Sequence, residues 1–525
     1  MTRWTPPVTP TRREEFLLKR LTRTKKLFAF LRGHRHALFD EGFQKELETM
    51  YRRTGAGTEP LPPARLCMVL LLQAYTGTSD AEAVELTIVD ARWQLVLDCL
   101  HATAPLVSQG ALQQFRERLI TAGLDRRLLE RTVELAKATQ AFDWKKLPKE
   151  LRIAVDSRPF EGAGRVEDTI NLLGHAARTL VRLAATLTER PIAHIARDAR
   201  IPIALAGSTK AALDRDWSDP AQRGPALDDL LAQIDSLQAW LERTGLRTEP
   251  PLQRYLAAIA QVRAQDTEPG PTGRVQITQG VAADRRVSIE EPAMRHGRKS
   301  KTKRFNGYKQ HVATDLDTDL ILACAVTPAN RPEDEATPSL TDDLAHQHVA
   351  IGTLYIDRGY INSPLVDEVQ TRGGDILCKP WRVRNIQPDL FNKTDFTLHM
   401  RDHTITCPAG HVERFEPGHV VEFDPDACGP CPLRSQCTRS ASGKGRTISI
   451  AADERLQQRL RGLQASASGR RQLRERVGVE HRLAHIAARQ GPRARYVGVR
   501  KNVFDLRRAA AIQNLETIHR RQSAA

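Results

Sequence analysis

The chain has 525 residues, which is enough for about three or four domains that each bury a core. Its formal net charge is +16, its pI is about 9.7 and only 5% of its residues are aromatic, so a polyanionic partner is expected. The longest apolar stretch, residues 66–72, is far short of the ~20 residues of a membrane helix. With no secretory segment at the N-terminus either, the sequence excludes a membrane association and predicts a cytoplasmic protein.

Residues 1–145 are expected to be helical. Helical periodicity marks Glu41–Tyr51 and Ala64–Tyr75, and the stretch from Arg12 to Arg35 is basic and amphipathic. Residues 78–80 can cap a helix that starts near Ala81. Small basic helical domains bind duplex DNA by laying a helix in the major groove, which is one interpretation. A helical scaffold or dimerisation module explains the pattern equally well.

Strands and helices then alternate along the chain. Strands are predicted at 151–156, 308–315, 320–326, 353–357 and 375–380, with a helix at 333–347 and helical stripes between residues 165 and 270. Without its inserts, this order predicts a mixed α/β sheet of five strands. The segment from Arg295 to Lys309 has seven Lys and Arg residues and no acidic residue. Asn306-Gly307 within it predicts a hairpin turn.

Three acidic residues stand in informative contexts. Asp156 and Asp357 each end an apolar run, whereas Glu480 lies in a basic helical pattern. A carboxylate at the end of a buried strand is held rigidly but stays open to solvent. Three such oxygen donors can hold a pair of divalent cations for phosphoryl transfer on a nucleic-acid backbone. The region around Glu480 is strongly basic, because residues 441–525 contain 19 Lys and Arg against 6 Asp and Glu.

Half of the eight cysteines are clustered. Twenty residues separate Cys407 from a Cys428-x-x-Cys431 pair, and Cys437 follows after five more. Because a reducing cytosol disfavours disulfides, the cluster predicts metal ligands, and its Gly/Pro-containing knuckle fits tetrahedral Zn²⁺. An iron–sulfur cluster and free thiols remain open alternatives.

Several motifs together resemble the DDE transposases of bacterial insertion sequences, whose catalytic core has the RNase H-like fold. The similar branch has a cysteine cluster between its second Asp and its Glu. The motifs that carry the resemblance are Val155-Asp-Ser, residues 162–175, 305–311, 328–334, 355–360, 479–481 and 495–502, and Asn514-Leu.

The resemblance implies that Asp156, Asp357 and Glu480 are the catalytic triad and bind two Mg²⁺ (or Mn²⁺) ions. It also implies a partner, double-stranded DNA, both as the terminal repeats of the element and as the target, bound by a dimer or higher oligomer in the nucleoid. Metal-dependent cleavage followed by strand transfer is the expected reaction. A nuclease with the same core but no strand transfer, or a catalytically silent DNA-binding descendant, are the alternatives.

The expected domains follow from these assignments. Residues 1–145 form the helical N-terminal domain, and the discontinuous RNase H-like core comprises 146–164, 296–380 and 465–525. A helical insert (165–295) and a Cys-rich, possibly zinc-binding insert (381–464) interrupt that core.

Five further side chains are candidates for nucleic-acid contact. Arg476 matches an arginine that the family often has four residues before its Glu. Leu473 and Ala487 stand where the family often has Tyr and Lys, and Arg489 lies near the second position but out of register. Lys309 and Arg358 are candidate phosphate contacts, and Trp381 could stack on an unpaired base.

Overall fold

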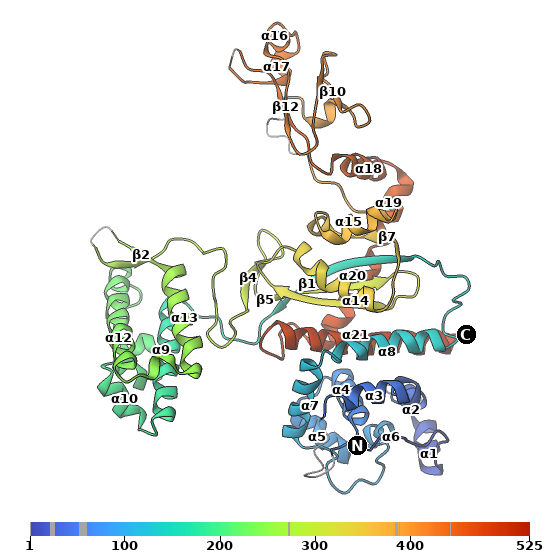
Figure 1. The fold of residues 1–525 in the computed structure, drawn as a ribbon, viewed down its shortest axis with the longest axis vertical. Coiled ribbons are helices and arrows are strands. Elements are labelled where there is room, and N and C mark those ends of the chain that lie inside the picture. The colour runs from blue at the N-terminus through green and yellow to red at the C-terminus, as the bar shows by residue number, and fades with distance from the viewer. Residues whose placement is uncertain are drawn as a thin grey trace. The chain divides into compact units, whose positions relative to one another are not determined.

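The computed structural model describes residues 2–21, 27–51, 60–270, 273–383, 387, 389–441 and 443–524 (Figure 1). The chain divides into two compact units. The first unit contains Met1–Lys149, Asp156–Val349 and Val479–Ala525, and the second contains Glu150–Val155 and Ala350–Gly478. None of the helices in the described parts combines the length and the apolar character needed to cross a lipid bilayer.

The N-terminal part of the first unit is helical, as the sequence predicts. The cap near residue 80 is also confirmed: Ser79 Oγ accepts from the Glu82 amide at 3.2 Å, and Glu82 Oε2 accepts from the Ser79 amide at 2.7 Å. The helices are α1 (Arg12–Arg20), α2 (Leu27–Leu38), α3 (Glu41–Glu48), α4 (Pro63–Thr76), α5 (Asp80–Val89), α6 (Ala91–Leu97), α7 (Gln109–Thr121) and α8 (Asp125–Ala138).

A six-stranded mixed sheet forms the centre of the α/β part. Its strand order is β4-β5-β1-β7-β8, and β6 pairs with β5. The strands β1, β7 and β8 are parallel, whereas β4, β5 and β6 are antiparallel to their neighbours. The strands are β1 (Leu151–Glu161), β4 (Arg295–Arg298), β5 (Arg304–Asp315), β6 (Ile321–Pro328), β7 (Ile351–Tyr355) and β8 (Asp375–Leu377).

Two sequence predictions about this sheet are wrong. The sheet has a sixth strand, β4, whose Arg-His-Gly-Arg sequence has none of the apolar alternation of a half-buried strand. Asn306-Gly307 is not a turn but part of β5. A Cβ on Gly307, whose φ is +154°, would lie 2.2 Å from the Phe160 carbonyl oxygen, so the glycine serves close strand approach instead.

The long helix α21 (Val499–Ala524) packs against α8, α4 and β6 within the first unit (Figure 1). Buried Asn514 makes this packing specific, because its Oδ1 accepts from the Ile321 amide and its Nδ2 donates to the Ile321 carbonyl, both at 2.8 Å. The same Nδ2 donates to Thr132 of α8 at 3.0 Å. One amide therefore joins the sheet, α8 and α21. The other helices beside this sheet are α14 (Thr337–His346) and α20 (Val477–Gln490).

Residues 165–295 contain a helical bundle with its own apolar core, as predicted. The core is made by side chains from α9, α10, α12 and α13, with Ile289 from the returning segment. The elements are α9 (Thr169–Leu187), α10 (Ile192–Asp198), α11 (Thr209–Ala212), α12 (Arg223–Arg243), α13 (Pro250–Asp266), β2 (Thr267–Pro269) and β3 (Val275–Ile277).

The second unit combines β7, β8 and α15 (Pro364–Thr371) with a segment of short strands and helices. A small core of apolar side chains supports that segment, and Cys407, Cys428 and Cys437 pack against it. The remaining elements are β9 (Thr397–His399), β10 (Thr404–Thr406), β11 (Val412–Arg414), β12 (Val420–Glu422), β13 (Thr447–Ser449), α16 (Pro425–Cys428), α17 (Arg434–Cys437), α18 (Glu454–Ala465) and α19 (Ala467–Arg474).

Candidate active site

Asp156 lies in the middle of β1, not at its end. The strand runs to Glu161, and burial changes at Asp156: Ile153, Ala154 and Val155 are fully buried, whereas Asp156 is half-exposed. Its Oδ1 accepts from the Ser157 amide at 2.8 Å. The Ser157 hydroxyl in turn donates to Glu333. The buried half of the strand therefore anchors the carboxylate, and Glu333 is a second acidic group beside it.

Polar contacts in the first unit fasten the end of α20 to β1. Arg158 donates to Gln310 of β5 at 2.7 Å and to Gln490 of α20 at 3.1 Å, and Gln490 donates to Asp505 at 2.7 Å. Burial lowers the pKa of Arg158 to about 10. A half-buried guanidinium held by amide oxygens joins the two elements that carry Asp156 and Glu480.

Glu480 lies in the first turn of α20. Val479, Leu483 and Ile486 bury one face of this helix, while Glu480 is exposed. The residue is therefore held on a packed helix and open to solvent, as the sequence predicts.

Asp357, in the second unit, follows β7 and begins the short 3₁₀ turn Arg358–Tyr360. It is exposed, and its Oδ1 accepts from the Arg358 amide at 2.9 Å. Beside it lies Cys378, whose pKa is raised to about 12 by burial and by the Asp357 carboxylate, against the opposing charges of Arg358 and Arg476. The second unit thus brings two predicted contact residues, Arg358 and Arg476, to the neighbourhood of Asp357.

A basic pocket of about 450 Å³ adjoins this turn in the second unit. Arg358 and Trp381 line it, and Trp381 is 45% exposed; their contact with nucleotides stays a prediction. Sequence reasoning proposed no contact role for five other polar residues of its lining. The signal for two of them was helical spacing: Arg461 and Gln464 follow Gln457, which accepts from the Trp381 amide, at i+4 and i+7 of α18. These five residues are Lys379, Arg382, Thr394, Arg461 and Gln464.

The other two candidate contacts are engaged within the first unit. Lys309 donates to the Arg331 carbonyl at 2.7 Å. Arg489 pairs with Glu516 at 2.7 Å and donates to the Tyr75 carbonyl at 3.3 Å. Both side chains hold the fold in this structure, and their role toward DNA stays a prediction.

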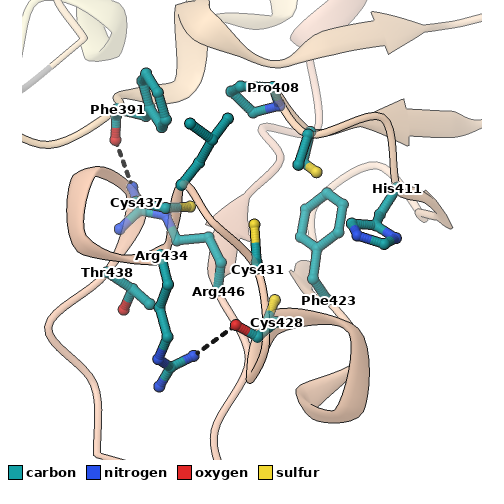
Figure 2. A pocket seen from close by; sticks show the side chains of 13 residues that line it. Phe391, Pro408, His411, Phe423, Cys428, Cys431, Arg434, Cys437, Thr438 and Arg446 are labelled. Carbon is teal, nitrogen blue, oxygen red and sulfur yellow. Dashed lines mark hydrogen bonds between the residues drawn. The ribbon is translucent and has the colours of Figure 1, made fainter.

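The four clustered cysteines line one small pocket in the second unit (Figure 2). Cys407 enters it from a turn in which its amide donates to the His411 carbonyl at 2.9 Å, and Cys428, Cys431 and Cys437 come from the α16–α17 segment. Burial raises the pKa of Cys437, and the three other thiols raise it further, against Arg446. The cavity volume is about 20 Å³, which is close to the room that one water-sized sphere needs.

Metal-binding geometry is not formed by the side chains as they stand. Among the residues that the structure describes, no three His, Cys, Asp or Glu side chains are grouped so as to hold a metal ion. Asp156 and Glu480 belong to the first unit and Asp357 to the second. All eight cysteines are free thiols. Of the four outside the cluster, which lie in apolar segments and would be expected in the core, Cys67, Cys324 and Cys378 are buried but Cys99 is only half-buried.

Comparison with known families assigns the chain to a protein family. Residues 276–515 match the family model described as Transposase DDE domain, and residues 19–118 match the model described as Transposase domain (DUF772). The chain belongs to the DDE transposases. Enzymes of this family are polynucleotidyl transferases that act on DNA and generally use divalent metal ions, and their catalytic fold is RNase H-like, consistent with the mixed sheet here.

The matched residue ranges include two of the three candidate catalytic acids of this transposase. Asp357 and Glu480 lie inside the DDE-domain match, which begins at residue 276, after most of the helical insert. Asp156 lies outside both matches, so its assignment depends on its strand and motif. No curated protein and no solved structure matches the chain.

Proposed function

We propose that this transposase binds the terminal repeats of an insertion sequence and catalyses metal-dependent cleavage and strand transfer of double-stranded DNA. The observation that carries the proposal is the set of three carboxylates on rigid supports: Asp156 on a buried strand, Asp357 on a capped turn and Glu480 on a packed helix. The transposase acts in the cytoplasm, on the DNA of the nucleoid, as a dimer or larger oligomer on DNA.

Hard oxygen donors suit Mg²⁺ or Mn²⁺, so the three carboxylates are the proposed ligands of two such ions. Bound ions would supply a more acidic attacking water or hydroxyl and charge stabilisation at phosphorus. The protein itself holds the carboxylate donors in place, and the packing of β1 and α20 does this for Asp156 and Glu480. Basic side chains around Asp357 would neutralise the DNA backbone, and Trp381 would stack on an unpaired base in the 450 Å³ pocket.

We also propose that the four cysteines hold a structural Zn²⁺. Their shared pocket and the mutual influence of their thiols support this, and the pocket volume fits one ion. Elemental analysis of the purified protein should find about one Zn per chain, whereas neither Zn nor Fe, with four freely alkylated thiols, would contradict the proposal.

The main test is strand transfer in vitro, with linear DNA that carries the element ends and a supercoiled target. The variants D156N, D357N and E480Q keep side-chain shape but lose a charged ligand, so each should lower the rate by about 10²-fold or more. Asp367, an exposed acid ten residues after Asp357, provides the control D367N, which should stay at wild-type rate.

Three outcomes would change the assignment. Full activity of all three variants would show that these residues are not the catalytic triad. Cleavage without joined products, and without preference for the element ends, would indicate a nuclease. Salt-dependent DNA binding with no metal-dependent cleavage by the wild-type chain would indicate a silent descendant.

A further inference from the structure

The turn between β4 and β5 carries an unusual concentration of positive charge. Residues 298–304, called here the hairpin tip, are exposed throughout. They include five cations and no acidic residue. The cations are Arg298, Lys299, Lys301, Lys303 and Arg304.

Within the described parts of the chain, none of these five cations has a carboxylate partner within ion-pair distance. The base of the same hairpin differs: Arg295 pairs with Asp284 at 2.8 Å, and Arg331 lies 3.9 Å from the same carboxylate. Asp284 thus neutralises the base and leaves the charge of the tip uncompensated.

The strand register brings like charges together. Arg298 lies directly opposite Arg304, and one step further the Lys299 amide donates to the Lys303 carbonyl at 2.9 Å. Like charges directly opposite on paired strands destabilise the pairing. A bound polyanion would relieve this repulsion, whereas a solvated surface would leave it in place.

The tip is attached to a rigid base next to the catalytic strand. Phe305 is buried, and a Cβ on Gly297, opposite it, would lie 2.7 Å from the Phe305 ring. The Asn306 amide donates to Glu161 Oε2 at 3.0 Å, and the Gly162 amide donates to the Asn306 carbonyl at 2.8 Å. These bonds fix β5 to the end of β1, five or six residues beyond Asp156.

We propose that the hairpin tip binds the phosphate backbone of duplex DNA beside the cleavage site. Along the strands, nine residue steps separate Asp156 from Lys303 through the Gly162–Asn306 contact. At ~3.3 Å per residue, plus ~5 Å across that contact, the separation is at most about 35 Å. One turn of B-DNA is about 34–36 Å long. The contacted phosphates therefore lie within one helical turn of the phosphodiester at Asp156. The placement of the contact relative to the cut rests on the proposed function, whereas the binding of DNA by the tip does not.

The proposed contacts go to phosphates, which carry no base-sequence information directly. Each phosphate neutralised by a cation of the tip contributes about 0.9 to the slope of log affinity against log salt concentration. The tip should therefore account for a slope of roughly 3–4 if most of its cations meet phosphates.

The test uses the full chain with R298Q, K299Q, K301Q, K303Q and R304Q combined. A matched control replaces five exposed arginines of the helical insert that are all ion-paired, R190Q, R197Q, R215Q, R247Q and R274Q, and changes the net charge equally. Fluorescence anisotropy with a 40-base-pair duplex between 50 and 300 mM NaCl gives the slope. In the tip variant, the magnitude of the slope should fall by about 3–4 and the affinity at 0.1 M salt by at least about tenfold. In the control, the magnitude of the slope should fall by less than about 1.

A charge-preserving variant and a footprint complete the design. R298K with R304K should keep the wild-type slope, which separates charge from hairpin stability. Hydroxyl-radical footprinting on element-end DNA should show protection within about ten base pairs of the cut that disappears in the tip variant. An unchanged slope, an equal loss in the control, or a footprint unaltered by the substitutions would overturn the proposal.

The two proposals fail in different ways. A wild-type chain that shows the tip-dependent slope but no metal-dependent cleavage would contradict the proposed function and leave the hairpin contact standing. A chain that cleaves and joins DNA with no change of slope in the tip variant would do the reverse.

Discussion

The helical insert and the Cys-rich insert interrupt the same α/β part of the chain but are stabilised differently. Among the described residues, the helical insert buries a cluster of 29 apolar side chains, whereas the Cys-rich insert has a cluster of seven with three cysteines packed against it. An apolar core of seven side chains is too small to stabilise a segment of this length without a cross-link or a metal. The first insert therefore depends on hydrophobic burial, whereas the second, by our proposal, depends on a metal held by its thiols.

The largest expected effect is loss of the Cys-rich insert on removal of the proposed metal. A zinc chelator, or the variant C431S, should abolish hydrogen-exchange protection across residues 396–450, because folding and metal binding are coupled in such segments. Protection of residues 169–266 should not change. The control C99S alters another half-exposed thiol outside the pocket and should leave both inserts intact. Persistent protection after complete chelation would show that the seven-residue core suffices.

Replacement of Asp266 should have the next largest effect, this time confined to the helical insert. This buried carboxylate accepts from Arg285 twice at 2.8 Å and from Thr169 at 2.9 Å, so it joins the start of α9, the end of α13 and the returning segment. D266A leaves Arg285 without its charge partner and should cost about 3–5 kcal/mol of local unfolding free energy, measured by hydrogen exchange.

Asp235 provides the matched comparison, since it also pairs with an arginine, Arg263, at 2.6 Å but is 60% exposed. D235A should cost less than about 1 kcal/mol. Similar costs for the two variants would mean that burial does not determine the strength of these pairs.

A cavity made in the helical bundle tests directly how much apolar burial contributes to the stability of the helical insert. Leu180 of α9 is fully buried in the cluster, and L180A should lower the local unfolding free energy by about 3 kcal/mol. Leu187, on the same helix, is 41% exposed, and L187A should change it by less than about 0.5 kcal/mol. Equal values would indicate that helix propensity, rather than packing, stabilises the bundle.

The sequence predicted features that depend on local pattern. The buried half of β1 and the bundle helices α9, α12 and α13 follow from apolar patterns alone, and α20 follows from the basic helical pattern around Glu480. Ser79 was predicted as part of a cap because the capping box is a local motif.

Features that depend on distant partners were missed. The continuation of β1 past Asp156 requires Arg158 to be covered by Gln310 and Gln490, which come from other parts of the chain. Gly307 was misjudged because its reason, contact with the Phe160 carbonyl, lies 147 positions away. The place of Arg461 in the basic pocket was missed as well, because only the fold brings α18 beside Trp381.

The smallest expected effect is a pH dependence of the helical insert. His175 of α9 lies between two carboxylates, with Nδ1 2.9 Å from Glu167 and Nε2 2.9 Å from Glu290. The hydrogen bond to Glu167 is the main cause that raises the pKa of His175, against partial burial.

Because the folded-state pKa of His175 is raised above the unfolded value of about 6.5, its contribution is fully present below that pH and is lost as pH rises through the folded-state pKa. The stabilisation should be under about 1 kcal/mol, since the pair with Glu290 is half-exposed. Hydrogen exchange of α9 at several pH values should therefore show a gain in acid that H175Q removes. The Cys-rich insert should respond oppositely, since protonation of its thiolates releases a bound metal. A parallel response of both inserts would contradict the division between burial and thiol coordination, because only the second mechanism weakens in acid.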